Sequence, residues 1–250
     1  MTPPPAWAVM RAVAAYGLPA APPIPTVGDD ALAWRRIIGL AEQQRVLGLL
    51  VAAVRDGRVA GPEGPLDGEA RSRLAAAHEA WCAHDLRLER ALLAGADALD
   101  RAGISYLVTK GPAMAHRAYP DAGQRLFADL DLIVPSGYVA AATRVLVEAL
   151  DATPALVELR PGFDERFGKE TLLRTTATPG APAGLEIDVH RTPVAGALGL
   201  AIPLDELFER PGRVEVAGRV LPTPGPVATL LLAAYQASVA DVPPRLGARR

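Results

Sequence analysis

The stretch Phe127-Ala128-Asp129-Leu130-Asp131-Leu132-Ile133-Val134 has the composition of a buried β-strand, which Pro135-Ser136-Gly137 ends. Asp129 and Asp131 are two residues apart, so their side chains are predicted to lie on the same face of this strand. Two carboxylates so close repel each other and are costly to desolvate unless a cation neutralises them. The pair therefore predicts a site for Mg²⁺ or Mn²⁺, which prefer oxygen ligands. The alternative is a strand end with two solvated aspartates.

A second motif, Lys110-Gly111-Pro112, stands between a predicted strand at residues 104–109 and a predicted short helix at residues 113–119. Gly111 allows close approach of a ligand to the backbone, and a helix N-terminus offers N–H groups to an anion such as phosphate. The chain has two lysines, Lys110 and Lys169, against 24 arginines. A lysine in such a composition suggests a need for a compact positive charge. The motif predicts phosphate binding, with a chance lysine at a turn as the alternative.

The segment Leu185-Glu186-Ile187-Asp188-Val189-His190 alternates apolar and polar residues. This period predicts a strand that buries one face and presents Glu186, Asp188 and His190 on the other. Such a strand would supply a third carboxylate beside Asp129 and Asp131. An ordinary solvated face of a sheet is the alternative.

These motifs, taken in order, resemble the uncharacterised nucleotidyltransferase family of the polymerase-β-like superfamily. The resemblance rests on Leu107-Val108-Thr109-Lys110-Gly111-Pro112-Ala113, Tyr119-Pro120-Asp121, Arg125 and Asp129-Leu130-Asp131-Leu132-Ile133-Val134. It is dense over residues 104–135 and weaker over residues 34–220. The chain departs from the superfamily's usual Gly-Ser phosphate turn, because no serine follows Gly111.

The resemblance implies a metal-dependent transfer of a nucleoside monophosphate from an NTP to a hydroxyl-type acceptor on a small molecule or protein. Asp129, Asp131 and Asp188 are implied as catalytic residues and ligands of Mg²⁺ or Mn²⁺, with Glu186 ranked after Asp188. Lys110, Gly111, Arg125 and His190 are implied as nucleotide-binding residues. Arg125 also has a structural alternative, an ion pair with Asp121 or with the Asp129/Asp131 edge, and His190 has one as a hydrogen-bonded structural residue.

Two other functions remain open at this point. A catalytically inactive, nucleotide-binding regulatory module would retain the same fold, since fold does not dictate function. The other function is that of a nucleotidyltransferase that acts on nucleic acid, either on tRNA or in the manner of a toxin. The net charge of −2 and the pI near 6.1 disfavour binding of nucleic acid.

The composition bounds the rest of the interpretation. The single cysteine excludes an intrachain disulfide framework. Residues 1–25 lack the basic start and apolar run of a signal peptide, and the longest apolar runs fall short of the ~20 residues that span a bilayer. These features predict a cytoplasmic protein without a membrane partner.

The order of motifs predicts an α/β (α+β) fold, with a mixed β-sheet nucleotidyltransferase core, an N-terminal helical region and a C-terminal helix. The expected division is a loosely attached Pro-rich arm at 1–28, a helical region at 29–102, the core at 103–221, and a C-terminal helix and tail at 222–250. Within it, we expect helices at residues 30–54, 68–102, 136–150 and 227–240. Strands are expected near residues 155–160 and 169–176, and a hairpin at residues 214–221.

Overall fold

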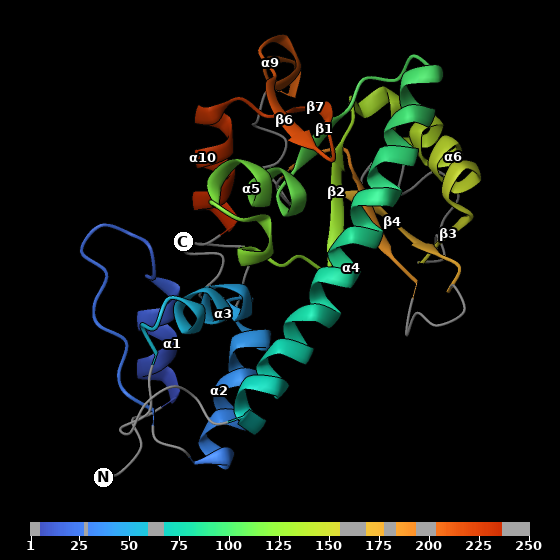
Figure 1. Cartoon of the computed structure of the whole chain (residues 1–250). Coiled ribbons are helices and arrows are strands. Elements are labelled where there is room, and N and C mark those ends of the chain that lie inside the picture. Colours follow the sequence, from blue (N-terminus) through green and yellow to red (C-terminus); the bar gives the residue numbers. More distant parts are fainter. Residues whose placement is uncertain are drawn as a thin grey trace. The chain divides into compact units, whose positions relative to one another are not determined.

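The computed structural model describes residues 6–27, 30–59, 68–155, 169–177, 184–193 and 204–236 (Figure 1). The chain divides into two compact units. The first consists of Met1–Ala83, Tyr119–Leu126 and Ala233–Arg250, and the second of His84–Ala118 and Phe127–Leu232. These two units differ from the four consecutive segments expected from the sequence, because each unit combines segments that are distant along the chain.

The first unit is helical. Its elements are α1 (Ala6–Ala14), α2 (Ala31–Gln43), α3 (Leu47–Arg55), the beginning of α4 (Gly68–Arg101) and the 3₁₀ turn η1 (Ala122–Gln124). Its core gathers apolar side chains from these elements and from the residues after η1, including Val9, Met10, Val13, Trp34, Ile37, Leu47, Leu50, Leu74 and Leu126. Because Val9, Met10 and Val13 are fully buried, residues 6–14 are packed into this core. The prediction that the arm is loosely attached is therefore wrong for this helix.

The single helix predicted over residues 30–54 is two helices in the structure. Asp30 caps α2, since its side chain accepts a hydrogen bond from the Leu32 N–H. The break comes after Gln43, where Arg45 takes a left-handed backbone conformation with φ of 58°. Arg45 lies over the ring of Trp81 at 5.5 Å, a cation–π distance. The apolar period continues across the break because α2 and α3 bury side chains in the same core.

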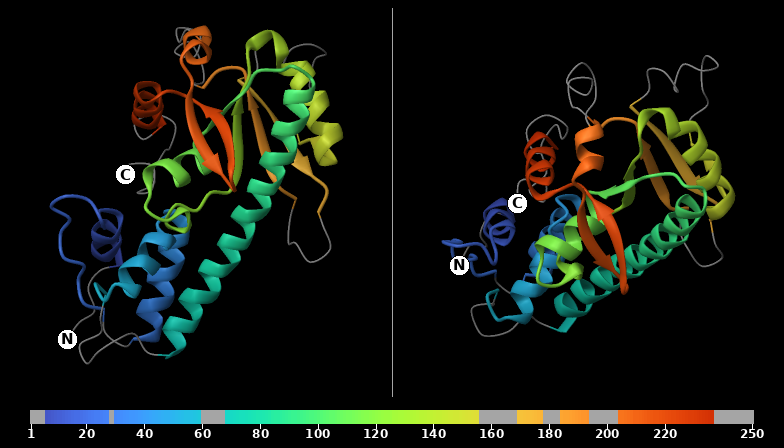
Figure 2. Two further views of the ribbon diagram at one scale, coloured as in Figure 1. Left: turned by 45° about the horizontal axis from the view of Figure 1, so that its top comes forward. Right: turned by 90° about the horizontal axis from the view of Figure 1, so that it is seen from above.

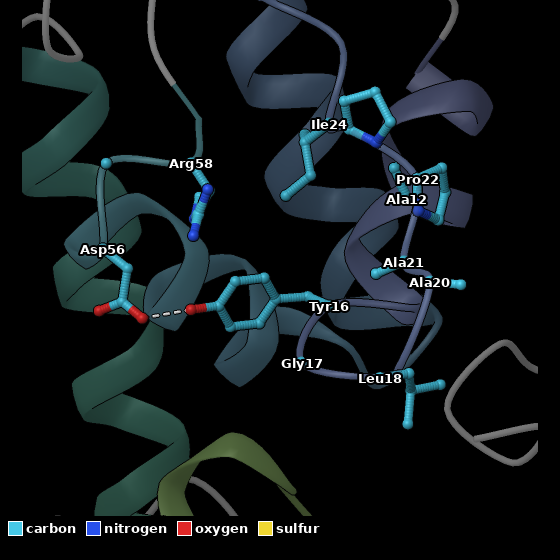
Figure 3. Close-up of a pocket in the computed structure, with 12 residues that line it drawn as sticks. Ala12, Tyr16, Gly17, Leu18, Ala20, Ala21, Pro22, Ile24, Asp56 and Arg58 are labelled. Atoms are coloured by element: carbon cyan, nitrogen blue, oxygen red, sulfur yellow. Dashed lines mark hydrogen bonds between the residues drawn. The ribbon is translucent and has the colours of Figure 1, made fainter.

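A cavity of about 790 Å³ lies in the first unit (Figure 3). It is lined by residues from the end of α1, the following loop and the segment after α3. The hydroxyl of Tyr16 donates a hydrogen bond to Asp56, and Figure 3 shows the Arg58 side chain beside the same space. Most of the lining residues belong to exposed loops.

The second unit contains a mixed five-stranded sheet with the strand order β1-β2-β5-β4-β3 (Figure 1). The strands are β1 (Leu107–Thr109), β2 (Asp129–Ile133), β3 (Ala152–Pro154), β4 (Glu170–Thr175) and β5 (Glu186–His190). β2 and β5 are parallel, whereas the pairs β1–β2, β4–β5 and β3–β4 are antiparallel. The mixed sheet predicted from the order of motifs is thus confirmed.

Helices and a hairpin surround this sheet within the second unit. α5 (Gly111–Ala118) packs against β1 and β2, and α6 (Val139–Leu150) packs against β3, β4 and β5. The hairpin of β6 (Gly212–Val216) and β7 (Arg219–Thr223), orange-red in Figure 2, forms a separate sheet. Its strand β7 contacts β1. The remaining elements are the 3₁₀ turn η2 (Ser136–Tyr138) and the helices α9 (Leu204–Glu209) and α10 (Pro226–Tyr235).

Period-two alternation explains why the sheet has one apolar and one polar face. Leu130, Leu132, Leu173, Ile187 and Val189 are at most 2% exposed and form the apolar core of the second unit. The opposite face carries the carboxylate, imidazole and guanidinium groups, together with the apolar Ile133 and Leu172, which pair with His190 and Asp188.

Two predicted elements extend beyond what the structure describes. The strand expected near residues 155–160 is not tested, because residues 156–160 lie outside the described residues; β3 ends before this range, at Pro154. The helix expected over residues 227–240 is α10, and residues 237–240 are likewise not described. No helix in the described ranges of the chain is long and apolar enough to cross a membrane.

Candidate functional site

The acidic residues of the site come together through the register of two parallel strands. Asp131 of β2 pairs with Asp188 of β5, and Asp129 pairs with Glu186. Paired positions in a sheet carry their side chains on the same face, so Asp131 and Asp188 are direct neighbours. His190, two residues after Asp188, lies on this face as well.

Three of these residues form a compact group of potential metal ligands. Asp131, Asp188 and His190 each offer one ligand atom, and the three atoms lie within 4.8 Å of one another. Asp129 is not a member of this group, although its charge contributes to the pKa shifts of Asp188 and Lys110. The structure thus brings together the predicted Asp131, Asp188 and His190, and leaves Asp129, two residues before Asp131 on β2, outside this group.

Asp131 is the centre of the charge interactions. It is 2% exposed, and its Oδ1 accepts hydrogen bonds from His190 Nε2, at 2.6 Å, and from Lys110 Nζ. Burial alone would raise the pKa of Asp131, but the contacts with His190 and Lys110 outweigh it and lower that pKa. The same contact with Asp131 raises the pKa of Lys110, overcoming the opposite effect of burial.

Asp188 has the opposite electrostatic environment. Burial, together with the neighbouring carboxylates of Asp131 and Glu170, raises the pKa of Asp188 to about 6. Two carboxyl groups on adjacent strands therefore have pKa values that are pushed apart, a pattern typical of sites that bind cations or move protons. A divalent cation at Asp188 would relieve this repulsion, so the donor set fits a Mg²⁺ or Mn²⁺ ion.

The Lys110-Gly111 turn contains a left-handed residue. The left-handed residue is Lys110, with φ of 51°, rather than the glycine. Gly111 is buried, and a Cβ on it would lie 3.2 Å from the carbonyl oxygen of Asp129 and 3.2 Å from the ring of Phe127. The glycine therefore lets α5 pack closely on the start of β2. Its role toward a phosphate stays a prediction.

Arg125, predicted as a phosphate ligand, belongs to the first unit. Its Nη1 donates a hydrogen bond to the carbonyl oxygen of Leu126 at 2.6 Å. The alternative partner considered for it, Asp121, lies 3.9 Å from Arg55 and accepts a hydrogen bond from the Gly123 N–H. The nucleotide-binding role of Arg125 stays a prediction.

Glu170 is a site residue that the sequence motifs did not indicate. It begins β4 directly opposite His190, and its Oε2 lies 2.9 Å from His190 Nδ1 and 2.7 Å from Lys169 Nζ. The contact with His190 outweighs burial and lowers the pKa of Glu170 to about 2. The contacts with Asp131 and Glu170 in turn raise the pKa of His190, although burial opposes this. The signal in the sequence was Lys169, the chain's second lysine, adjacent to Glu170.

Comparison with known proteins identifies the family. Residues 30–242 match the family model described as uncharacterised nucleotidyltransferase. A search of curated proteins finds no match. Among solved structures, the chain is similar to the lincomycin-bound lincosamide antibiotic adenylyltransferase LnuA, with 13% identity and a TM-score of 0.39 over 64% of this chain and 95% of that one.

A second similar structure is an antigenic nucleotidyltransferase-like protein from Paracoccidioides brasiliensis. It has 15% identity and a TM-score of 0.38 over 66% of this chain and 74% of that one. TM-scores this low say nothing about the substrate of this chain. The family model, in contrast, covers most of the chain, including the segments around Lys110 and Asp131. The chain therefore belongs to the uncharacterised nucleotidyltransferase family.

Proposed function

We propose that this protein transfers a nucleoside monophosphate from an NTP to a hydroxyl-type acceptor on a small molecule or protein and releases pyrophosphate, with Mg²⁺ or Mn²⁺ as cofactor. The observation that carries this proposal is the in-register pair Asp131 and Asp188 on adjacent parallel strands, beside Lys110. Membership in the nucleotidyltransferase family supports the same reaction class.

For the metal site we assign Asp131 and Asp188 as ligands. Asp129, two residues before Asp131 on the same strand, is the third candidate ligand. A bound Mg²⁺ or Mn²⁺ would neutralise phosphate charge and activate the acceptor hydroxyl. Lys110 carries the charge suited to the phosphates of the NTP, and its side chain is 34% exposed, so a ligand can reach it. The N–H groups at the start of α5 lie next to Lys110 in the chain and offer further hydrogen bonds to an anion.

The transfer step itself is a displacement at the α-phosphorus. The acceptor oxygen forms a bond to this phosphorus while the bond to the bridging oxygen of the leaving pyrophosphate breaks. The acceptor's proton must go to a base, and in the alternative to metal ligation Asp188 would take this role.

One structural observation favours the alternative of an inactive nucleotide-binding module. Lys110 and His190 already provide two hydrogen bonds to Asp131 Oδ1, so protein groups compensate this buried carboxylate without a metal ion. A module of this kind would bind NTP and Mg²⁺ but would release no pyrophosphate.

The decisive experiment measures pyrophosphate release from each of the four NTPs with Mg²⁺, with mass spectrometry of candidate acceptors and of the protein itself. We expect turnover by the wild type and a loss of at least about 100-fold in Asp131→Asn, as for removal of a key electrostatic group. Glu186→Gln is the matched control, because Glu186 lies on the same face but pairs with Arg174, and it should retain activity within about twofold. NTP binding without turnover by the wild type would identify the inactive module.

A further inference from the structure

Five charged or titratable side chains form a continuous series across three strands of the second unit, which we call the charge chain. Its members are Lys110, Asp131, His190, Glu170 and Lys169. His190 is the middle member: Nε2 lies 2.6 Å from Asp131 Oδ1 and Nδ1 lies 2.9 Å from Glu170 Oε2. Lysines stand at both ends, on Asp131 and on Glu170.

The middle of the charge chain is closed to water. Asp131 is 2% exposed and His190 is 1% exposed. Nδ1 of His190 and Oε2 of Glu170 are both inaccessible to water and lie 2.9 Å from each other, and the same Oε2 also contacts Lys169 Nζ at 2.7 Å. Glu170 Oε2 is therefore the polar partner of His190 Nδ1, because buried polar atoms are rarely left unpaired. The imidazole is thus confined between two carboxylates.

The composition of the chain supports a specific role for this arrangement. The protein has 24 arginines and two lysines, and the two lysines are the two ends of the charge chain. An ammonium group is a compact point charge that contacts a single carboxylate oxygen, whereas a guanidinium group tends to hold both oxygens. A lysine on Asp131 therefore leaves the second carboxylate oxygen available.

The contacts on Asp131 show which oxygen is available. Lys110 and His190 both contact Oδ1, and among the residues that the structure describes no hydrogen bond or ion pair reaches Oδ2. The oxygens of an ionised carboxylate can only accept hydrogen bonds, so Nε2 of His190 must donate its hydrogen to Oδ1 of Asp131. A nitrogen that carries a hydrogen has no lone pair with which to bind a cation. His190 in this rotamer is not suited to ligate a metal.

We propose that Glu170, anchored by Lys169, positions His190, and that His190 in turn orients the Asp131 carboxylate so that Oδ2 faces the metal ion. Glu170 and His190 are then positioning residues, and the metal ligands are the aspartates. This inference rests on the metal site of the proposed function. It changes the role of His190, which the sequence motifs assigned to nucleotide binding.

The first test determines whether His190 ligates the metal. Electron spin echo envelope modulation of the wild-type protein loaded with Mn²⁺ detects the nitrogen of a coordinating imidazole. We expect no imidazole nitrogen coupling in the wild type, and a spectrum that is unchanged in His190→Gln. A nitrogen coupling that disappears in His190→Gln would overturn the assignment.

The second test measures Mn²⁺ affinity directly, without NTP or acceptor. We expect Glu170→Ala to weaken Mn²⁺ binding about tenfold, the lower end of the range for residues that orient metal ligands. Glu170→Gln retains an acceptor for His190 Nδ1 and should recover affinity to within about threefold of the wild type. Asp205→Ala, at an exposed aspartate in the first turn of α9, is the control and should leave Mn²⁺ affinity unchanged.

The outcomes separate this inference from the proposed function. If the wild type binds Mn²⁺ and Glu170→Ala binds it equally well, with a change in melting temperature alone, Glu170 is merely structural and the positioning inference is wrong. If the wild type and Asp131→Asn bind Mn²⁺ with the same affinity, the metal site of the proposed function fails, and the inference fails with it.

Discussion

Lys110 shows how one residue can have a structural and a functional role. Its backbone is left-handed, its carbonyl oxygen accepts a hydrogen bond from Met114 N–H at 2.7 Å, and its ammonium group holds Asp131. The sequence predicted a cation for phosphates at this position. The structure adds that the same cation compensates a buried carboxylate, so removal of Lys110 is expected to reduce stability as well as nucleotide affinity.

A prediction at the residue scale concerns Asp188 in the metal-free protein. The pKa of Asp188 is about 6 in the folded state, above its ordinary value of 3.8. Because the pKa of Asp188 is higher in the folded state than in the unfolded state, the ionised carboxylate destabilises the fold. This penalty is absent at low pH and is complete once the pH has risen through 6. Asp188→Asn removes this penalty, which is about 1 kcal/mol of unfolding free energy at pH 8 when solvent screening is considered. The melting temperature of the variant at pH 8 should therefore be a few degrees higher.

The measurement is thermal unfolding of both proteins in the presence of a chelator between pH 4 and pH 8. The advantage of Asp188→Asn should shrink as pH falls below about 6 and nearly vanish near pH 4, where the wild-type carboxyl group is protonated. A variant that is less stable than the wild type at pH 8 would contradict the electrostatic account.

At the scale of elements, close packing decides where helices end and how they approach one another. Gly48 in α3 is fully enclosed, and a Cβ at this position would lie 2.1 Å from the carbonyl oxygen of Gly123. Gly39 in α2 has no atom within 4 Å of the corresponding position and is exposed. Both glycines are in helices of the same unit, so the two substitutions by alanine form a matched pair.

We expect opposite effects of these two substitutions on the free energy of unfolding. Gly39→Ala should stabilise by about 0.5–1 kcal/mol, because alanine has a higher helix propensity than glycine. Gly48→Ala gains the same propensity but forces the backbone of η1 away from α3, and should destabilise by about 1–3 kcal/mol or more. Chemical denaturation of both variants checks this, and equal effects would show that the approach of α3 to η1 is not constrained.

At the scale of the whole molecule, the proposed metal site links binding to stability. A ligand that binds the folded state alone stabilises it by about 2.7 kcal/mol at a concentration of 100 Kd. We expect Mg²⁺ or Mn²⁺ to raise the melting temperature of the wild type by several degrees. The metal-dependent rise should be absent in Asp131→Asn.

The control for this titration is Asp205→Asn, since Asp205 is an exposed aspartate in the first turn of α9. This variant should retain the full metal-dependent rise. An equal rise in Asp131→Asn and the wild type would place the stabilising ion elsewhere and would remove the main support for the site.

The sequence alone determined the local features of this protein. Alternation of apolar and polar residues has a period of two, so the strands with Asp129 and Asp131 and with Asp188 and His190 could be predicted from neighbouring residues. The order of motifs also identified the family, which the family model over residues 30–242 confirms. The long helix α4 and the mixed sheet were predicted for the same reason, because each follows from local pattern and order.

The tertiary structure decided which of these residues meet. Asp131 and His190 are 59 residues apart in sequence, and they meet because β5 lies parallel to β2 in a defined register. Glu170 joins them because β4 pairs with the other edge of β5, an arrangement that no local period encodes. Sequence periodicity specifies the face on which a side chain lies, whereas the partner across that face depends on strand order and register.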